Sequence, residues 1–167
     1  MENSEKTAKI AYYRTPVGIA RITAEDGFIT SVSVNNIEHE VEPVEDALLN
    51  EAMKQLDEYF AGTRKDFDFP IKQPGSDFQQ GVWRQLLTIP YGHTISYGQQ
   101  SRILNNLLGI RAIASANGRN ALWLVVPCHR VIGSDGSLTG YASGVWRKRW
   151  LLEHEARVAG VGQATLF

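Results

Sequence analysis

The sequence predicts an α+β protein in two parts. A small N-terminal αβ domain with an antiparallel sheet is expected over residues 1–75, and a C-terminal domain of the winged helix-turn-helix type over residues 76–167. The early residues alternate like half-buried strands, those beyond 76 have helical spacing, and residues 72–76, Lys-Gln-Pro-Gly-Ser, have the composition of a linker. A chain of 167 residues suits one compact domain or two small ones.

Three strands and one helix are predicted in the N-terminal part. Residues 10–14, 18–24 and 28–34 are rich in β-branched and aromatic side chains, and Asp-Gly at 26–27 is a strong hairpin signal. Residues 43–60 repeat apolar side chains at helical spacing. Phe-Asp-Phe-Pro at 67–70 suggests a further short strand.

Helices dominate the predicted C-terminal part. Asp77 can cap a first helix that Pro90 and Gly92 end. Ser96 can cap a second helix over residues 97–104, and Asn105 and Asn106 then turn the chain into a third over 108–117 that Gly118 closes. Two short helices joined by a tight turn have the shape of a helix-turn-helix.

The rest of this part brings an apolar run and a wing. Residues 122–126 are apolar and lead, as an expected strand, into Pro-Cys-His-Arg at 127–130. Residues 134–137 form a turn, residues 138–141 a return strand that would serve as the wing, and residues 146–157 a final helix.

Composition excludes several classes of protein. Hydrophobic residues make up 43% and charged residues 21%, as in an ordinary globular protein. No apolar run approaches the roughly 18 residues that span a membrane, and the N-terminus lacks the apolar stretch of a signal peptide. A single cysteine cannot build a disulfide framework or a Cys-based zinc site, and the four histidines lack metal-ligand spacing. We therefore expect no metal and a cytoplasmic location.

Charge is divided unevenly along the chain. Residues 1–75 carry 8 Lys and Arg against 14 Asp and Glu, a balance of −6, whereas residues 76–167 carry 9 against 4, a balance of +5. A basic half suits a polyanion such as nucleic acid. The alternative is uneven surface charge with no partner.

Cys128 is the sole thiol and the candidate nucleophile. A lone cysteine is usually a small buried apolar residue, but here Pro127 precedes it and His129 and Arg130 follow. A histidine can take the thiol proton, and cationic neighbours favour the nucleophilic thiolate. Adjacent residues of a strand point to opposite faces, so contact between Cys128 and His129 requires a bridging water or a turn.

Glu155 is the candidate third member of the site. It shares one side of the last helix with Leu151 and Leu152, and a carboxylate buried there needs a partner. His129 is a suitable partner, because an acid can hold the imidazole and stabilise the imidazolium. An exposed glutamate near the helix end is the alternative.

The segment from Arg111 to Gly118 is rich in small residues. We expect Ala112, Ser115, Ala116 and Gly118 on the exposed side of its helix, where they could fit a narrow DNA groove, with Arg111 inserted to hold the base stack open. Tight helix–helix packing with a solvated Arg111 would produce the same pattern.

The C-terminal residues resemble a known family. Val-Pro-Cys-His-Arg-Val at 126–131 is similar to the active-site signature of the O6-alkylguanine-DNA alkyltransferases, the methylated-DNA–protein-cysteine methyltransferases. The resemblance covers residues 76–167 densely, through IPYG (89–92), SYG (96–98), ANGRN (116–120), PCHRVIG (127–133), TGY (139–141) and LLEHE (151–155). Residues 1–75 resemble the family's small N-terminal αβ domain only in length and pattern.

Catalytic roles follow from the resemblance alone. It implies that Cys128 accepts the alkyl group, that His129 is a water-mediated base and that Glu155 orients it. Asn120 matches a hinge residue between the recognition helix and the active-site strand, and Tyr97 a residue that donates toward N3 of the flipped guanine.

The resemblance also implies DNA contacts and a pocket. Arg111 matches the finger that replaces the extruded base, with Ala112, Ser115, Ala116 and Gly118 beside it on the DNA-binding helix. Tyr141 matches the pocket wall, and the main chain near Cys128 and Val131 would bind the base edge.

The implied activity is DNA repair by a suicide reaction. The substrate is double-stranded alkylated DNA, bound through its minor groove and flipped, and the transfer is stoichiometric, irreversible and free of cofactors. The protein would be a monomer in solution that could assemble cooperatively on DNA.

Several positions depart from the family pattern. The chain lacks the cysteines of a zinc site found in some members, and Ala142 and Ser143 replace glycine or serine of some relatives. Trp123 stands where many relatives have proline or a small residue on the pocket strand. We expect Trp123 to narrow the pocket, so that methyl lesions react far faster than benzyl lesions.

Three other functions remain open. An alkyltransferase-like lesion sensor typically has tryptophan at the position of Cys128. A cysteine hydrolase would leave the helix-turn-helix pattern unexplained, and a winged-helix transcription regulator would have no use for the reactive-site signature.

Overall fold

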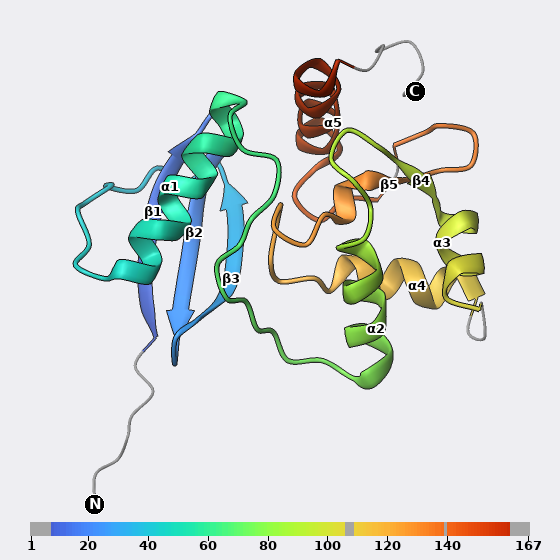
Figure 1. Cartoon of the computed structure of the whole chain (residues 1–167), viewed down its shortest axis with the longest axis horizontal. Helices are drawn as coiled ribbons and strands as arrows, with labels where there is room; N and C mark the ends of the chain where they lie inside the picture. The colour runs from blue at the N-terminus through green and yellow to red at the C-terminus, as the bar shows by residue number, and fades with distance from the viewer. Residues whose placement is uncertain (1–7, 106–108, 139, 161–167) are drawn as a thin grey trace, which may run out of the picture. The chain divides into compact units, whose positions relative to one another are not determined.

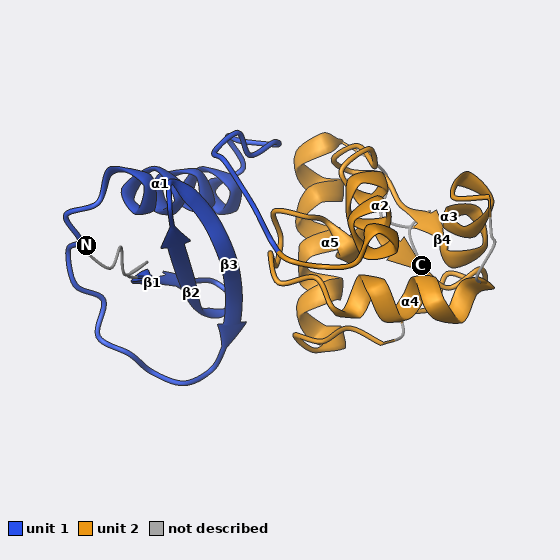
Figure 2. Ribbon diagram, turned by 90° about the horizontal axis from the view of Figure 1, so that it is seen from below, with its two compact units in different colours: residues 1–73 blue, residues 74–167 orange. Residues whose placement is uncertain are grey.

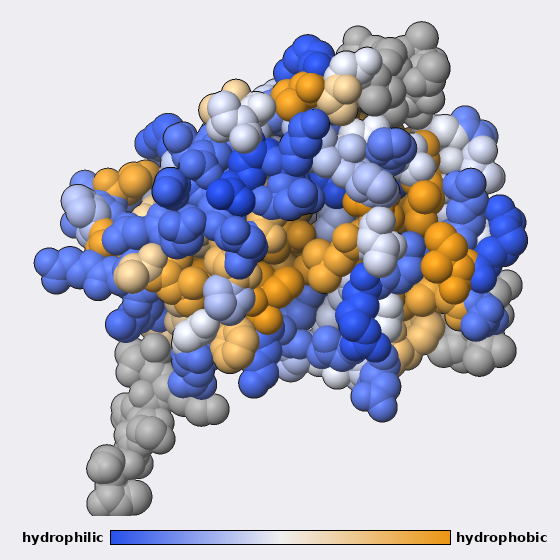
Figure 3. Space-filling model, in the orientation of Figure 1, coloured by the Kyte–Doolittle hydropathy of each residue, from blue (hydrophilic) through white to orange (hydrophobic). Residues whose placement is uncertain are grey.

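The computed structural model describes residues 8–105, 109–138 and 140–160. The chain divides into two compact units, Met1–Gln73 and Pro74–Phe167 (Figure 2). No helix in the described ranges is both long and apolar enough to cross a membrane. Hydrophilic residues cover much of the face drawn in Figure 3, with hydrophobic groups between them.

The N-terminal unit is a three-stranded antiparallel sheet with a helix packed against it (Figure 1). Its strands are β1 (Lys9–Thr15), β2 (Gly18–Glu25) and β3 (Phe28–Asn35), in the order β1-β2-β3. The predicted antiparallel sheet is confirmed. The hairpin signal at Asp26-Gly27 is also confirmed: both residues have positive φ, 51° and 83°, as the tight turn between twisted strands requires.

Helix α1 (Ala47–Ala61) begins four residues later than expected, because the side chain of Asp46 caps it by accepting from the Leu49 amide. The predicted strand at 67–70 is wrong. A single bridge joins Ile71 to Ile29 of β3, with the Pro70 carbonyl accepting from the Ile29 amide at 2.9 Å. Proline has no amide hydrogen to donate, so a regular ladder does not extend through it.

The C-terminal unit is mainly helical, and two very short strands join its parts. Its elements are, in order, α2 (Asp77–Leu86), β4 (Ile95–Ser96), α3 (Tyr97–Ile103), α4 (Gly109–Gly118), the 3₁₀ helix η1 (Cys128–Arg130), β5 (Val131–Ile132) and α5 (Val145–Ala159). Strands β4 and β5 pair in parallel. This pairing places the start of α3 beside the end of η1.

Two helix starts show how local sequence fixes these elements. Ser96 caps α3 as predicted and forms a capping box with Gln99. The predicted cap of α2 is one residue off, because Ser76 and Gln79 form the capping box and Asp77 is the first helical residue. A carboxylate in the first turn still favours the positive end of the helix dipole.

Helices α3 and α4 are tied together inside the unit. The buried side chains of Gln100 and Asn117 exchange two hydrogen bonds, of 3.0 and 2.9 Å. Helix α2 also contacts α4, because the Trp83 indole donates a hydrogen bond to the Ala116 carbonyl at 2.9 Å. The helix pair is therefore held by polar contacts as well as by packing.

The wing differs from the prediction. The turn at 134–137 is present, closed by a 2.8 Å hydrogen bond from the Gly133 amide to the Ser137 carbonyl. No strand follows it in residues 138, 140 and 141, and residue 139 lies outside the described part of the chain. Gly140 has φ 59°, and the Tyr141 carbonyl accepts from the Gly144 amide, so the chain turns there instead of extending.

Candidate active site

The segment that leads to Cys128 is a series of tight turns, so the expected active-site strand is wrong. The Val125 amide donates to the Trp123 carbonyl at 2.8 Å across Leu124, whose φ is 74°. The Cys128 amide then donates to the Val126 carbonyl at 2.8 Å across Pro127, whose φ of −82° and ψ of 66° define an inverse γ-turn. Positive φ at a leucine is strained, and such strain concentrates at functional sites.

Beyond the turns, Cys128–Arg130 form one turn of 3₁₀ helix. The turn that contact between Cys128 and His129 requires in the absence of a bridging water is therefore present. Cys128 is partly exposed, whereas His129 is completely buried. The two adjacent side chains therefore occupy different environments.

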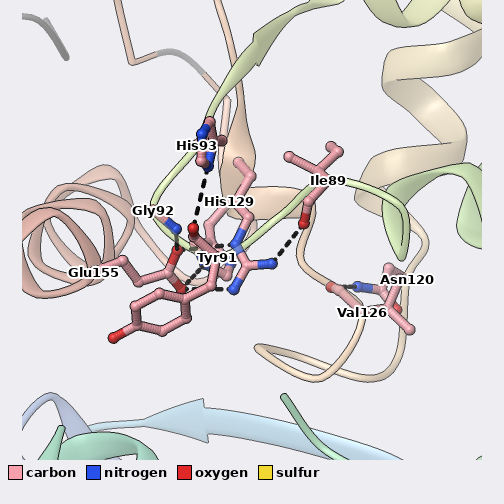
Figure 4. A network of polar contacts seen from close by, with 9 residues as sticks. Ile89, Tyr91, Gly92, His93, Asn120, Val126, His129 and Glu155 are labelled. Carbon is pink, nitrogen blue, oxygen red and sulfur yellow. Dashed lines mark hydrogen bonds and ion pairs between the residues drawn. The ribbon is translucent and has the colours of Figure 1, made fainter. Parts of the chain in front are cut away.

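Glu155 of α5 is the centre of a buried polar network (Figure 4). Its carboxylate accepts from His129 Nε2 at 2.8 Å, from Arg130 Nε and Nη2 at 2.9 and 3.0 Å, and from the Gly92 amide at 3.4 Å. Arg130 Nη1 also donates to the Ile89 carbonyl at 2.8 Å. Glu155 is 1% exposed, so the alternative of a solvated glutamate at the helix end does not hold.

The network sets the charge states of its members. Burial alone would raise the pKa of Glu155, but the charges and hydrogen bonds of His129 and Arg130 outweigh burial and hold that pKa far below the usual range. Burial lowers the pKa of His129 against the opposing pull of Glu155. A neutral imidazole therefore donates from Nε2 to an ionised carboxylate. Its other nitrogen, Nδ1, is buried and has no hydrogen-bond partner among the described residues.

Asn120 links the turns to the thiol. Its Nδ2 donates to the Val126 carbonyl at 2.8 Å and toward Cys128 Sγ at 3.6 Å, and its Oδ1 accepts from the Leu122 amide at 2.9 Å. Burial raises the pKa of the Cys128 thiol above its ordinary value, and this effect outweighs the Asn120 hydrogen bond and the charge of Lys148, which lower it.

Cys128 lies in the wall of a cavity of about 40 Å³ that is partly open to solvent. The wall is built by residues from α3, α4, the turns and the loop before α5: Tyr97, Ala114, Asn117, Gly118, Asn120, Trp123, Cys128, Gly140, Tyr141, Ala142 and Ser143. The predicted pocket residues Tyr141, Trp123, Ala142 and Ser143 are all in this wall. Val131 is not; it lies in β5, with its side chain fully buried.

Both cavity tyrosines keep their protons at neutral pH. Burial raises the pKa of Tyr97, and proximity to the Cys128 thiolate raises it further. The same two causes raise the pKa of Tyr141 well above its ordinary value, although the polar group of the neighbouring Trp123 opposes them. The cavity therefore presents two phenolic donors beside the thiol.

The predicted surface of α4 needs one correction. Arg111, Ser115 and Gly118 are exposed and Ala112 is partly exposed, but Ala116 is 2% exposed. Ala116 lies three residues after the buried Ile113, on the same face of the helix, and its carbonyl accepts from Trp83. Ala116 therefore packs inside the unit and does not belong to the outer surface.

Two charged residues of the site were missed. Arg130 was considered only as a cationic neighbour of Cys128, yet it makes a bidentate contact with Glu155. Lys148 lies seven residues before Glu155 on α5 and four before Leu152, so helical spacing places it on the buried face. That spacing is a signal by which Lys148 could have been identified in the sequence. The Arg130 contact joins distant parts of the chain, so no local pattern indicates it.

Among the described residues, no group of three or more His, Cys, Asp or Glu side chains is placed to hold a metal ion.

Comparison with known proteins gives matches over both units. Residues 77–157 match the family "6-O-methylguanine DNA methyltransferase, DNA binding domain", and residues 9–73 match "6-O-methylguanine DNA methyltransferase, ribonuclease-like domain". A methylated-DNA–protein-cysteine methyltransferase of Mycobacterium bovis is 41% identical over 153 residues, covering 86% of this chain and 92% of the relative. A constitutive protein of the same name from Bacillus subtilis is 43% identical over 140 residues, covering 77% and 82%.

Solved structures agree with these matches. The crystal structure of Mycobacterium tuberculosis O6-methylguanine methyltransferase has a TM-score of 0.80 and 38% identity, and it covers 90% of this chain and 94% of its own. The structure of the Mycobacterium tuberculosis protein in complex with DNA has a TM-score of 0.80 and 39% identity, with coverage of 89% and 93%.

Proposed function

The chain belongs to the 6-O-methylguanine DNA methyltransferase family, and we propose that it repairs duplex DNA by moving an alkyl group, mainly methyl, from O6 of guanine to Cys128. Its class of enzyme is the methylated-DNA–protein-cysteine methyltransferase, here acting once per molecule. One observation carries the assignment to this cysteine: Cys128 lies in the cavity wall, and the next residue, the buried His129, is hydrogen-bonded to the buried carboxylate of Glu155. The protein would act in the cytoplasm as a monomer in solution, with cooperative assembly on DNA as a further property.

The thiol proton leaves through His129. A neutral imidazole can act as a base, and Nδ1 is the nitrogen that Glu155 does not occupy. A water molecule would carry the proton from Sγ to Nδ1. The imidazolium that forms is stabilised by the Glu155 carboxylate, which Arg130 keeps ionised and in place.

Alkyl transfer is then an in-line displacement. The thiolate forms a bond to the alkyl carbon, the bond from that carbon to O6 breaks, and its electron pair goes to the guanine. Tyr97, a protonated phenol in the cavity wall, donates toward N3 as the base leaves. The product is a thioether, which has no carbonyl for water to attack. The reaction therefore stops after one event and needs no cofactor.

The target carbon must first leave the base stack. Flipping the nucleotide costs a few kcal/mol, which contacts with the DNA offset. The outer side of α4 carries small residues at Ala112, Ser115 and Gly118, which would allow close approach to a minor groove, and Arg111 near its start would fill the place of the flipped base. Gly118 belongs both to this surface and to the cavity wall, so the surface and the cavity adjoin.

Mass spectrometry tests the proposal directly. The protein is incubated with excess duplex oligonucleotide carrying O6-methylguanine, and each molecule is expected to gain one methyl group on Cys128, whereas Cys128→Ser gains none. A lesion sensor or a transcription regulator would gain no mass. A cysteine hydrolase would release product repeatedly and return to its starting mass, and either result would reject the proposal.

A further inference from the structure

Four consecutive residues of the loop before α5 form one side of the cavity that contains Cys128. They are Gly140, Tyr141, Ala142 and Ser143. Residues 140–144 belong to neither a helix nor a strand, and a 2.9 Å hydrogen bond from the Gly144 amide to the Tyr141 carbonyl closes a turn within them. Loops are more mobile than the elements they connect. The width of the cavity therefore depends on what anchors this loop.

The side chain of Arg147, in the first turn of α5, reaches back to this loop. Its Nη1 donates to the Ser143 carbonyl at 2.7 Å. Arg147 is 5% exposed, although an arginine is rarely buried to this extent unless it is paired. Burial lowers the pKa of Arg147, and the proximity of Tyr141 opposes that shift. The guanidinium therefore lies near the cavity wall as well as near the end of the loop.

A positive charge in the first turn of α5 does not stabilise the helix itself. The amino end of a helix dipole is positive and favours an acidic side chain. The first turn of α5 contains no acidic residue, and Gly144 at its N-cap has no side chain to accept from the helix amides. The contact with the loop, and not the helix, therefore accounts for a buried arginine at position 147.

Trp146 packs on both the guanidinium and the end of the loop. The central carbon of the Arg147 guanidinium lies 4.4 Å from the centroid of the Trp146 ring, within the range of a cation–π contact. A Cβ atom added to Gly144 would lie 3.3 Å from the indole, so the ring also lies close to this part of the backbone. Trp146 is 51% exposed. An exposed ring and a buried guanidinium thus hold the loop where it joins α5.

We propose that Arg147 is a positioning residue which, with Trp146 stacked on it, holds residues 140–143 beside Cys128 and so limits the size of the alkyl group that the cavity accepts. The role in lesion choice rests on the proposed function, whereas the restriction of the cavity is a property of the free protein. Without this anchor the loop can move outward, and larger groups reach the sulfur more easily.

The first test compares two thiol reagents in the full-length protein without DNA. Iodoacetamide and N-benzyl-iodoacetamide share the reacting carbon and the leaving group, but the second carries an aromatic ring. Cys128 is the sole cysteine, so thiol alkylation, measured as mass gained, reports on this site. The ratio of the two second-order rate constants cancels any change in the pKa of the thiol. In Arg147→Met, which removes the donor to the loop, we expect the ratio of the benzyl reagent to iodoacetamide to rise about tenfold.

Further variants separate the anchor from charge and from folding. Arg149→Met removes a positive charge from an exposed position of the same helix, and its ratio should match the wild type. Arg147→Lys keeps a donor for the Ser143 carbonyl and should retain most of the restriction. Trp146→Ala removes the stacked ring at an exposed position, where folding is least at risk, and should also raise the ratio. Trp146→Phe keeps an aromatic ring and should stay near the wild type.

The second test presents O6-benzylguanine and O6-methylguanine in the same duplex, so that an effect on DNA binding cancels from the ratio of their rates. Arg147→Met and Trp146→Ala should shift this ratio toward the benzyl lesion, as they do with the reagents. A duplex ratio that stays at the wild-type value would overturn the role in lesion choice.

An unchanged reagent ratio in Arg147→Met, or in Trp146→Ala if the arginine variant does not fold, would overturn the proposal, as would an equal rise in Arg149→Met. The two proposals fail separately. Wild-type protein that gains no methyl group from the methylated duplex rejects the proposed function, whereas the reagent ratios still decide whether Arg147 and Trp146 hold the cavity wall.

Discussion

Glu155→Gln is the substitution whose consequence the structure defines best. The carboxylate accepts from three neighbours, His129, Arg130 and the Gly92 amide, at 1% exposure. Glutamine has nearly the same size and keeps one oxygen, but it replaces the other oxygen with a donor and removes the charge. The Arg130 guanidinium, 5% exposed, would then be buried without its counter-charge.

The expected cost is large. Removing one partner of a buried ion pair destabilises a protein by about 3–5 kcal/mol, because the remaining charge stays desolvated. A domain is usually stable by only about 5–15 kcal/mol, so this one substitution removes much of the stability of the C-terminal unit. Glu153→Gln is the matched control. It makes the same chemical change at a partly exposed position of α5, where we expect an effect within about 0.5 kcal/mol.

Urea unfolding followed by tryptophan fluorescence measures the effect in the right part of the chain. The four tryptophans, Trp83, Trp123, Trp146 and Trp150, all lie in the C-terminal unit. Their emission therefore reports on that unit alone. The dependence of the free energy of unfolding on urea concentration, the m value, should be the same in variant and wild type if both unfold in the same transition. A loss below about 1 kcal/mol, or one equal to that of the control, would refute the reasoning from the buried pair.

The titration of this network, the cavity wall and the contact between α2 and α4 each support one further prediction. The pKa values of Glu155 and His129 are both lowered in the folded protein, so the unfolded chain binds more protons in acidic solution. As the pH is lowered below about 6.5, the free energy of unfolding of the C-terminal unit should decrease, first through protonation of His129 and in more acidic solution through protonation of Glu155. A free energy of unfolding that stays constant between pH 7 and 4 would contradict this. Trp123→Ala should enlarge the cavity and raise the rate on O6-benzylguanine relative to O6-methylguanine in duplex DNA, and an equal ratio of the two second-order rate constants in variant and wild type would reject the narrowing hypothesis. Trp83→Phe removes the hydrogen bond to the buried Ala116 carbonyl and should lower the free energy of unfolding by about 1–3 kcal/mol in the same urea assay, whereas no loss would show that this contact contributes little.

Local signals in the sequence predicted much of the fold. The Asp26-Gly27 hairpin and the Ser96 cap depend on residues adjacent in the chain, and both are confirmed. The family resemblance, stated from short motifs of the C-terminal part, is confirmed by matches over both units. The cap of α2 was misplaced by one residue, because Ser76 and Asp77 are both good capping residues and only the geometry of the Gln79 side chain distinguishes them.

The expectations that fail do so for two reasons: some depend on contacts between distant residues, and one depends on a local conformation that composition does not reveal. Ala116 was expected on the surface, because small residues occur on both sides of α4 and the sequence does not say which side meets Trp83. The burial of Glu155 could not be derived from spacing, since its partners are up to 63 positions away along the chain. The turns at Leu124 and Pro127 cannot be distinguished from a strand in the sequence, because an apolar run has the same composition in either conformation.

The paired amides of Gln100 and Asn117 have a consequence for how DNA binding should be measured. Neither amide side chain titrates, and salt screens buried hydrogen bonds only weakly. We therefore expect the contact between α3 and α4 to be unaffected by added salt or by a change of pH. The slope of DNA affinity against salt concentration should then report the number of counterions released from the phosphates, without a contribution from movement of the two helices against each other.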